Sequence, residues 1–145
     1  MQIWSQTPSL AALNALGKSA MSEHLGIEII EIGDDFLRAR MPVNERTRQT
    51  YGILHGGASV VLAETLGSVA AAYCVDSPKK IVVGLDINAN HVRPVKSGNN
   101  VIGTARPLHI GATTQVWEIR IENEQGALVC ISRLTLAVID RREFV

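Results

Sequence analysis

The chain has few of the residues that would place it in a specialised structural class. Among its 145 residues only two are cysteines, Cys74 and Cys130, too few and too far apart for a disulfide scaffold. They also lack the spacing of metal ligands, so buried, reduced thiols are the expectation. The histidines at positions 24, 55, 91 and 109 show no metal-ligand spacing either. We therefore expect no metal site.

An excess of either charge is absent, because 14 basic residues balance 14 acidic ones. A strong basic excess would indicate nucleic acid or an anionic membrane, so neither is expected as a partner. The first residues lack the basic and apolar regions of a secretory signal, and a cytoplasmic location is the default. The motifs G-x-G-x-x-G and G-x-S-x-G are also missing, which argues against a dinucleotide loop and a nucleophile elbow.

A long apolar run free of charge is missing too. The most apolar stretch, residues 56–74, contains one charged residue, Glu64. A membrane span needs about 20 mostly apolar residues, so a buried core helix is the better interpretation. Carboxylates are rarely buried without a partner or a task. Glu64 is therefore the first candidate for chemistry, with an arginine-paired carboxylate at a sheet margin as the alternative.

The residues that are present indicate one folded domain over residues 1–145, since 46% are hydrophobic. A short helix is expected over residues 8–16, capped by Thr7 and ended by Gly17. Two strands should follow, at residues 26–32 and 36–43. Beyond the long helix the pattern is β, at residues 81–90, 100–107, 117–122 and 127–139. This order predicts an α+β fold with a core over about 25–140, in which a curved, mostly antiparallel sheet of five or six strands wraps around one long apolar helix.

Two features of the long helix suggest a site. Glu64 and Ser68 lie one turn apart on one stripe, although the Ser68 hydroxyl could simply bond back to a helix carbonyl. Gly56 and Gly57 leave backbone N–H groups uncovered at the helix start, where an oxyanion could bind. The alternative is that these glycines only allow a sharp turn. Gln49 and His55 flank the preceding loop and could face the same point.

The motif Gln49-x-x-Gly52-x-Leu54-His55-Gly56-Gly57, followed by Glu64 and Ser68, resembles the active-site segment of hotdog-fold acyl-CoA thioesterases. Residues 84–94 and 107–117 resemble the segments that follow it in that family. The chain is most similar to the PaaI-like branch that includes 1,4-dihydroxy-2-naphthoyl-CoA and 4-hydroxybenzoyl-CoA thioesterases. The resemblance covers about residue 25 to the C-terminus and implies the hotdog fold.

This resemblance implies hydrolysis of an acyl-CoA or aroyl-CoA thioester to the free acid and coenzyme A. Glu64 would be the nucleophile or general base, and the Gly56 N–H would hold the carbonyl oxygen. Gln49 and His55 would orient the substrate or the attacking water, and Ser68 would assist. Coenzyme A, which is part of the substrate and not a cofactor, would contact a larger set. That set is Gly84, His91, Val92, Arg93, Pro94, Arg106, His109, Ile110, Gly111, Ala112, Thr113 and Thr114.

The spacing of Gly56 and Glu64 also predicts a shared site. Eight residues of helix separate the two by about 12 Å along the axis. A reacting carbonyl carbon must lie about 3 Å from both nucleophile and oxyanion donor, which one chain does not easily provide. We therefore expect a homodimer with shared sites, and the resemblance implies a dimer of dimers, a homotetramer. The alternative functions are a hotdog hydratase or dehydratase and a non-catalytic acyl-CoA-binding protein.

Overall fold

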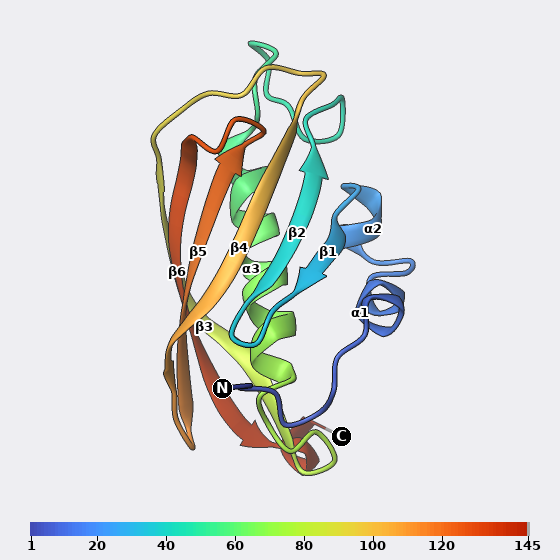
Figure 1. Ribbon diagram of the computed structural model, residues 1–145, viewed down its shortest axis with the longest axis vertical. Helices are drawn as coiled ribbons and strands as arrows, with labels where there is room; N and C mark the ends of the chain where they lie inside the picture. The colour runs from blue at the N-terminus through green and yellow to red at the C-terminus, as the bar shows by residue number, and fades with distance from the viewer. Residues whose placement is uncertain (145) are drawn as a thin grey trace.

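The computed structural model describes residues 1–144, in which a six-stranded sheet curves around one long helix (Figure 1). The elements follow in the order α1 (Leu10–Leu16), α2 (Met21–His24), β1 (Glu28–Ile32), β2 (Leu37–Pro42), α3 (Gly56–Ala72), β3 (Lys80–His91), β4 (Asn100–Ile110), β5 (Thr114–Asn123), β6 (Leu128–Asp140) and the 3-10 turn η1 (Arg141–Phe144). Among the helices of this part of the chain, none is both long and apolar enough to cross a bilayer.

The strands lie in the order β1-β2-β4-β5-β6-β3, and every neighbouring pair is antiparallel. Strand β3 therefore lies at an edge of the sheet, although it is third in the sequence. The α+β class and the six-stranded antiparallel sheet around a single long helix confirm the predicted hotdog fold.

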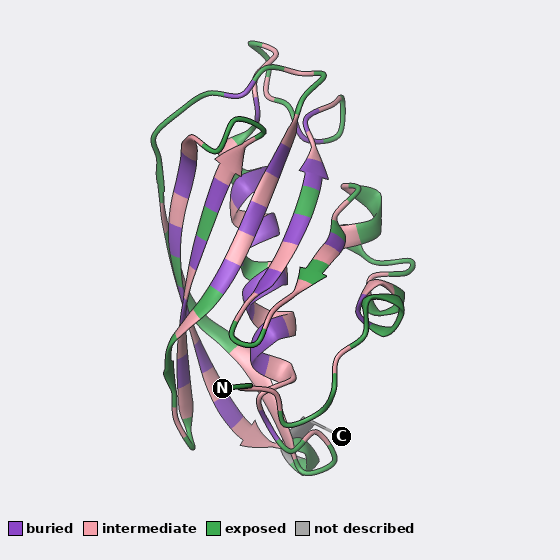
Figure 2. Cartoon of the chain, viewed as in Figure 1, coloured by how far each residue is buried: buried purple, intermediate pink, exposed green. Residues whose placement is uncertain are grey.

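The core lies between α3 and the concave face of the sheet, and its residues follow the periodicity of the sequence (Figure 2). Leu37, Ala39 and Met41 of β2 are fully buried on one face, as the alternation in the sequence predicts. Gly67 of α3 lets the helix pack closely on the sheet, because a Cβ there would lie 2.8 Å from a methyl carbon of Leu134.

Several element boundaries differ from the sequence-based expectation, and two of these differences have a clear physical cause. Helix α1 begins at Leu10, and its N-cap is Ser9, whose hydroxyl accepts the Ala12 N–H at 3.2 Å. The predicted start at residue 8 was therefore wrong, because Ser9 makes the capping bond in place of Thr7. Strand β4 continues beyond Pro107 to Ile110, since a bulge between residues 107 and 109 absorbs the proline.

A second bulge interrupts β3 after Gly84. Gly84 pairs with Leu136 and Asp86 pairs with Thr135, so Leu85 is an extra residue. After the bulge Ile87 and Ala89 pack against the core, whereas Leu85 is 64% exposed. In an uninterrupted strand Leu85 and Ile87 would face the same side of the sheet, and the bulge breaks this alternation.

The fold separates two ends of the molecule (Figure 1). At the upper end of the view lie the start of α3, the end of β3 and the loops over residues 44–54 and 92–99. At the lower end lie the end of α3, the start of β3 and the turn between β4 and β5.

Candidate active site

The start of α3 offers one free backbone donor. His55 is the N-cap, and its Nδ1 accepts the N–H of Gly57 at 2.8 Å. The carbonyl of His55 accepts the Ala58 N–H at 3.0 Å, and the backbone N–H of His55 donates to the carbonyl of Thr47 at 2.8 Å. Of the four N–H groups at the helix start, that of Gly56 is left without an acceptor among residues 1–144. At the positive end of the helix dipole, this donor can stabilise a developing oxyanion.

The loop before α3 holds Gln49 in place through its own hydrogen bonds. The Gln49 N–H donates to the Ile53 carbonyl at 2.8 Å, and the side-chain Oε1 accepts the N–H of Tyr51. The buried Thr47 hydroxyl donates to the Pro42 carbonyl at 2.7 Å and ties the loop to β2. The side-chain nitrogen of Gln49 thus remains as a donor on an ordered loop.

An open cavity of about 420 Å³ joins this loop to the end of β3. It is lined by Gln49, Ile53, Leu54, Gly56, Ser59, His91, Val92, Arg93, Pro94 and Val129. The structure therefore brings together six residues that the sequence proposed separately, namely Gln49, Gly56 and residues 91–94. Sequence patterns gave no signal for Ser59 or Val129, because their place in the lining depends on how distant segments pack.

His91 lies directly over the free donor. A Cβ on Gly56 would lie 2.9 Å from Nε2 of His91, so the ring leaves no room for a side chain at position 56. Nearby, the Arg93 guanidinium donates to the Leu128 carbonyl at 2.6 Å, which fixes the arginine beside the cavity. Both side chains are exposed and available to a ligand at the mouth of the cavity.

Glu64 lies two turns further along α3 and is exposed in the single chain. It takes part in none of the ion pairs between described residues, so the alternative of an arginine-paired carboxylate is not supported. Its Oε1 lies beside Gly84 of β3. Within one chain Glu64 therefore does not line the cavity that contains Gly56.

Ser68 lines a second, more apolar cavity of about 240 Å³ between α1 and α3. Its walls are Leu13, Asn14, Leu16, Gly17, Ser22, Ile27, Ile29, Thr65, Ser68 and Val69. Asn14 holds α1 in place, because its side chain donates to the Ile29 carbonyl at 2.9 Å and accepts the Ile29 N–H at 2.8 Å. Sequence patterns did not predict this cavity, although Thr65, Ser68 and Val69 share one side of a helix.

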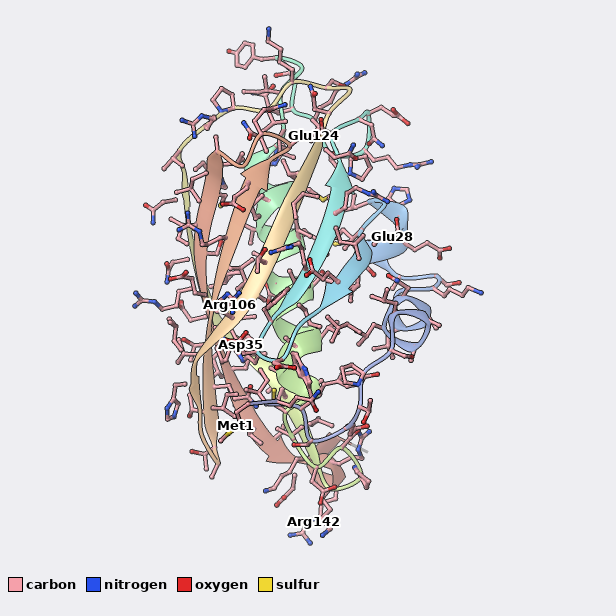
Figure 3. The ribbon with its side chains drawn as sticks, viewed as in Figure 1. Met1, Glu28, Asp35, Arg106, Glu124 and Arg142 are labelled. Carbon is pink, nitrogen blue, oxygen red and sulfur yellow. The ribbon has the colours of Figure 1, made fainter. Side chains whose placement is uncertain are left out.

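Other expected coenzyme A contacts do not converge within one chain. Arg106 forms an ion pair with Asp35 at 2.6 Å, and its guanidinium lies 4.6 Å from the ring centroid of Phe36 (Figure 3). Residues 109–114 comprise the end of β4, the turn and the start of β5, at the opposite end of the molecule from residues 91–94 (Figure 1). In this turn the Gly111 N–H donates to the Thr114 carbonyl at 2.9 Å. A single chain thus presents two separate parts of the expected binding surface.

The titrating groups with altered pKa lie away from these cavities. Burial raises the pKa of the Cys74 thiol from 9.0 to about 12, and it also raises the pKa of Cys130. Both thiols are free, but only Cys130 is fully buried, so the expectation of two buried thiols was partly wrong. A hydrogen bond from Lys80, with its positive charge, lowers the pKa of Asp140. Among the described residues no cluster of His, Cys, Asp and Glu could hold a metal ion.

Comparisons with known proteins identify the family of the chain. Residues 51–130 match the family model described as the thioesterase superfamily. The 1,4-dihydroxy-2-naphthoyl-CoA hydrolase of Escherichia coli is 53% identical over 94% of this chain and 99% of its own. The proofreading thioesterase EntH of Cronobacter turicensis is 51% identical over 94% and 98%.

A solved structure extends the match to three dimensions. A variant of a thioesterase from Pseudomonas aeruginosa superposes with a TM-score of 0.94 and is 48% identical. The match covers 96% of this chain and 99% of that one. From the family model, the relatives and the shared architecture together, the chain belongs to the thioesterase superfamily.

Proposed function

We propose that this protein hydrolyses an acyl-CoA or aroyl-CoA thioester to the free acid and coenzyme A. The observation behind the proposal is that α3 presents two groups without a partner among residues 1–144. They are the Gly56 N–H at its capped start and the Glu64 carboxylate in its middle. A thioester carbonyl can be opened by a carboxylate and an oxyanion donor. The names of the E. coli and Cronobacter relatives, a naphthoyl-CoA hydrolase and a thioesterase, support the same class.

Two routes use these groups. In one, a Glu64 oxygen attacks the carbonyl carbon, the C–S bond breaks, and coenzyme A leaves as a thiolate that takes a proton from water. Water then cleaves the mixed anhydride and restores the carboxylate. In the other, Glu64 accepts a proton from water as the water oxygen attacks, and the C–S bond breaks from the tetrahedral intermediate. Incorporation of labelled solvent oxygen into Glu64 during a single turnover distinguishes the first route from the second.

The test is release of free thiol from aryl, short, medium and long acyl-CoAs. Glu64→Gln keeps the shape of the side chain but removes its basicity, so we expect kcat to fall by about 10²–10⁴-fold. Ligand binding should persist, which separates an enzyme from a non-catalytic binding protein. Glu118→Gln is the matched control, because Glu118 points away from the core between the buried residues Trp117 and Ile119. A Glu64→Gln variant with wild-type thiol release contradicts the proposal.

We further propose that the site is completed by a second copy of the chain. Strand β3 is an edge strand of 12 residues without proline, and such edges pair readily with another strand. Antiparallel pairing of two β3 strands reverses one chain relative to the other. It would set the two α3 helices side by side in opposite directions and bring the partner's helix start toward Glu64. Light scattering would report whether two such dimers associate further into the expected tetramer.

Mixing of two inactive variants tests the shared site. Proline is tolerated at the first position of a helix but has no N–H, so Gly56→Pro removes the proposed oxyanion donor. Gly56→Ala is its control, since it creates the same conflict with His91 but keeps the N–H. Glu64→Ala and Gly56→Pro chains that exchange subunits should regain part of the activity. If the subunits exchange and no activity returns, the shared site is disproved.

The cavity between α1 and α3 is our proposed site for the acyl group. It begins beside Ser68, one turn from Glu64, and its walls are mainly apolar. At roughly 30 Å³ for each water-sized group, its 240 Å³ has room for about eight such groups. The hydroxyls of Ser22, Thr65 and Ser68 could also bind a polar substituent on the acyl group.

Leu16 and Leu10 provide a matched pair for this part of the proposal. Both are exposed residues of α1, but only Leu16 lines the cavity. Leu16→Trp should lower kcat/KM for aryl and medium acyl-CoAs by at least about tenfold, with little effect on acetyl-CoA. The reason is that a single methylene group in an apolar pocket is already worth roughly 1–3 kcal/mol of transition-state binding. Leu10→Trp should leave the ratio of kcat/KM between these acyl-CoAs and acetyl-CoA unchanged. Equal losses for every acyl length would place the acyl group elsewhere.

A further inference from the structure

Gly84 is a glycine that its own backbone does not require. The glycines with positive φ are Gly26, Gly52, Gly98 and Gly126, where a side chain would be strained. Gly84 is not among them and pairs regularly with Leu136 in β3. Alanine could adopt this conformation without strain. Any reason for a glycine at position 84 must therefore come from its surroundings.

Those surroundings consist of one group. A Cβ on Gly84 would meet a single heavy atom within 4 Å outside its neighbours in the chain, namely Oε1 of Glu64 at 2.9 Å. An alkyl carbon at 2.9 Å from an oxygen is inside their van der Waals contact distance, so one of the two atoms would have to shift. Because Oε1 is at the far end of a flexible side chain, the carboxylate would move and the strand would stay. A side chain at position 84 would thus cost the fold little and displace Glu64.

The carboxylate has no ion pair that would resist such a displacement. Glu64 is exposed and takes part in none of the ion pairs between described residues. The bulge at Leu85 follows Gly84 directly, and bulges beside active sites redirect nearby groups. The surface of β3 is therefore what the Glu64 carboxylate rests against.

We propose that Gly84 is a positioning residue, whose missing side chain gives the Glu64 carboxylate its place against β3. Its catalytic consequence rests on the proposed function, in which the carboxylate must reach a carbonyl carbon or a water molecule. A misplacement of about 1 Å in such a group can cost roughly 10²-fold in rate. This role differs from the coenzyme A contact that the family resemblance implied for Gly84.

The test compares Gly84→Ala with Gly103→Ala. Gly103 is a strand glycine of β4 without positive φ, and its Cβ would lie 3.4 Å from side-chain atoms of Leu62 and Leu66, which is ordinary contact. Gly84→Ala should lower kcat by about 10–100-fold with a nearly unchanged KM. Its Tm should equal or exceed that of the wild type, because alanine restricts the unfolded chain. Gly103→Ala should keep the wild-type kcat. A stable Gly84→Ala enzyme with wild-type kcat overturns the proposal.

Two further measurements separate this proposal from the function on which it rests. A shorter carboxylate fits beside a Cβ, so Glu64→Asp should cost less kcat in the Gly84→Ala background than in the wild type. Independently of activity, the Glu64 Cδ resonance, assigned by its loss in Glu64→Gln, should shift in Gly84→Ala but not in Gly103→Ala. An unshifted resonance disproves the contact. If the wild type cleaves no thioester but the Glu64 Cδ resonance still shifts in Gly84→Ala, the proposed function is overturned. The positioning of Glu64 by Gly84 is then still supported.

Discussion

Nδ1 of His55 lies 2.8 Å from the backbone nitrogen of Gly57 and accepts its hydrogen. An imidazole nitrogen that accepts a hydrogen bond carries no proton, so the neutral ring holds its proton on Nε2. The same contact uses one donor of the helix start and leaves the Gly56 N–H free. His55 thus has a structural task in addition to the substrate-orienting role expected from the sequence.

Replacement of His55 should separate these two roles. His55→Ala removes the cap and should lower the free energy of unfolding by about 1 kcal/mol. His55→Asn should keep most of this stabilisation, because asparagine is itself a good N-cap. We expect kcat to decrease in the order wild type, His55→Asn, His55→Ala. Urea unfolding and thiol release measure the two effects. Ser9→Ala, which removes the cap of α1, should lower stability without changing kcat. Equal kcat values for both His55 variants would show that the cap does not matter for turnover.

Gln115 should be a strong determinant of stability. Its buried side chain accepts the Trp117 indole N–H at 2.8 Å and donates to the Ala71 carbonyl at 3.3 Å, near the end of α3. Gln115→Leu leaves the buried Trp117 indole N–H without an acceptor, whereas the Ala71 carbonyl still accepts the Cys74 N–H at 3.1 Å, and should cost about 1–3 kcal/mol. The decreases in the free energy of unfolding caused by Gln115→Leu and by Trp117→Phe should together exceed the decrease in the double variant. Denaturant titrations of the four proteins measure this, and strict additivity would contradict it.

Arg106 should contribute to stability more than to substrate binding. It pairs with Asp35 and lies over Phe36, whose ring centroid is also 5.1 Å from Arg38. Phe36→Leu should therefore lower stability by roughly 1 kcal/mol, since exposed cation–π contacts are of this size. Arg106→Gln should leave KM for acyl-CoA unchanged, whereas Arg93→Gln, at the cavity, should raise it. A raised KM in Arg106→Gln at unchanged stability would instead support the phosphate contact expected from the sequence.

The Cys74 thiol should destabilise the folded chain at high pH. Burial raises its pKa from 9.0 to about 12, so the folded state disfavours the thiolate relative to the unfolded state. The contribution of the neutral thiol to the free energy of unfolding is complete below pH 9 and is lost as the pH rises from 9 toward 12. Tm should therefore fall more between about pH 8 and pH 10.5 in the wild type than in Cys74→Ala. Identical pH profiles of the two proteins would contradict the shift.

Local patterns predicted the parts of this fold that depend on neighbouring residues. The alternation of Leu37, Ala39 and Met41 gave the buried face of β2, because side chains of a strand point to opposite sides. The pair Gly56-Gly57 gave the start of α3, since uncovered N–H groups belong at a helix start. The family motif in turn brought Glu64 and Gly56 forward as a pair.

Long-range pairing determined what local patterns could not show. The bulge at Leu85 exists only in the register of β3 with β6, some fifty residues away, so no alternation within β3 reveals it. The cavity beside Ser68 depends on the docking of α1 through Asn14 to Ile29. The choice of Ser9 over Thr7 as a cap is a competition between two residues that both suit the position.

The place of β3 in the sheet has a consequence for the order of events during synthesis. Its partner within the chain is β6, the last strand to be made. Until residues 128–140 have left the ribosome, β3 has no neighbour, and the surface behind Glu64 does not yet exist. Domains fold as units once their segments are available. Hydrolytic competence should therefore arise only after β6 has been made and has paired with β3, and a chain that still lacks β6 should leave thioesters uncleaved.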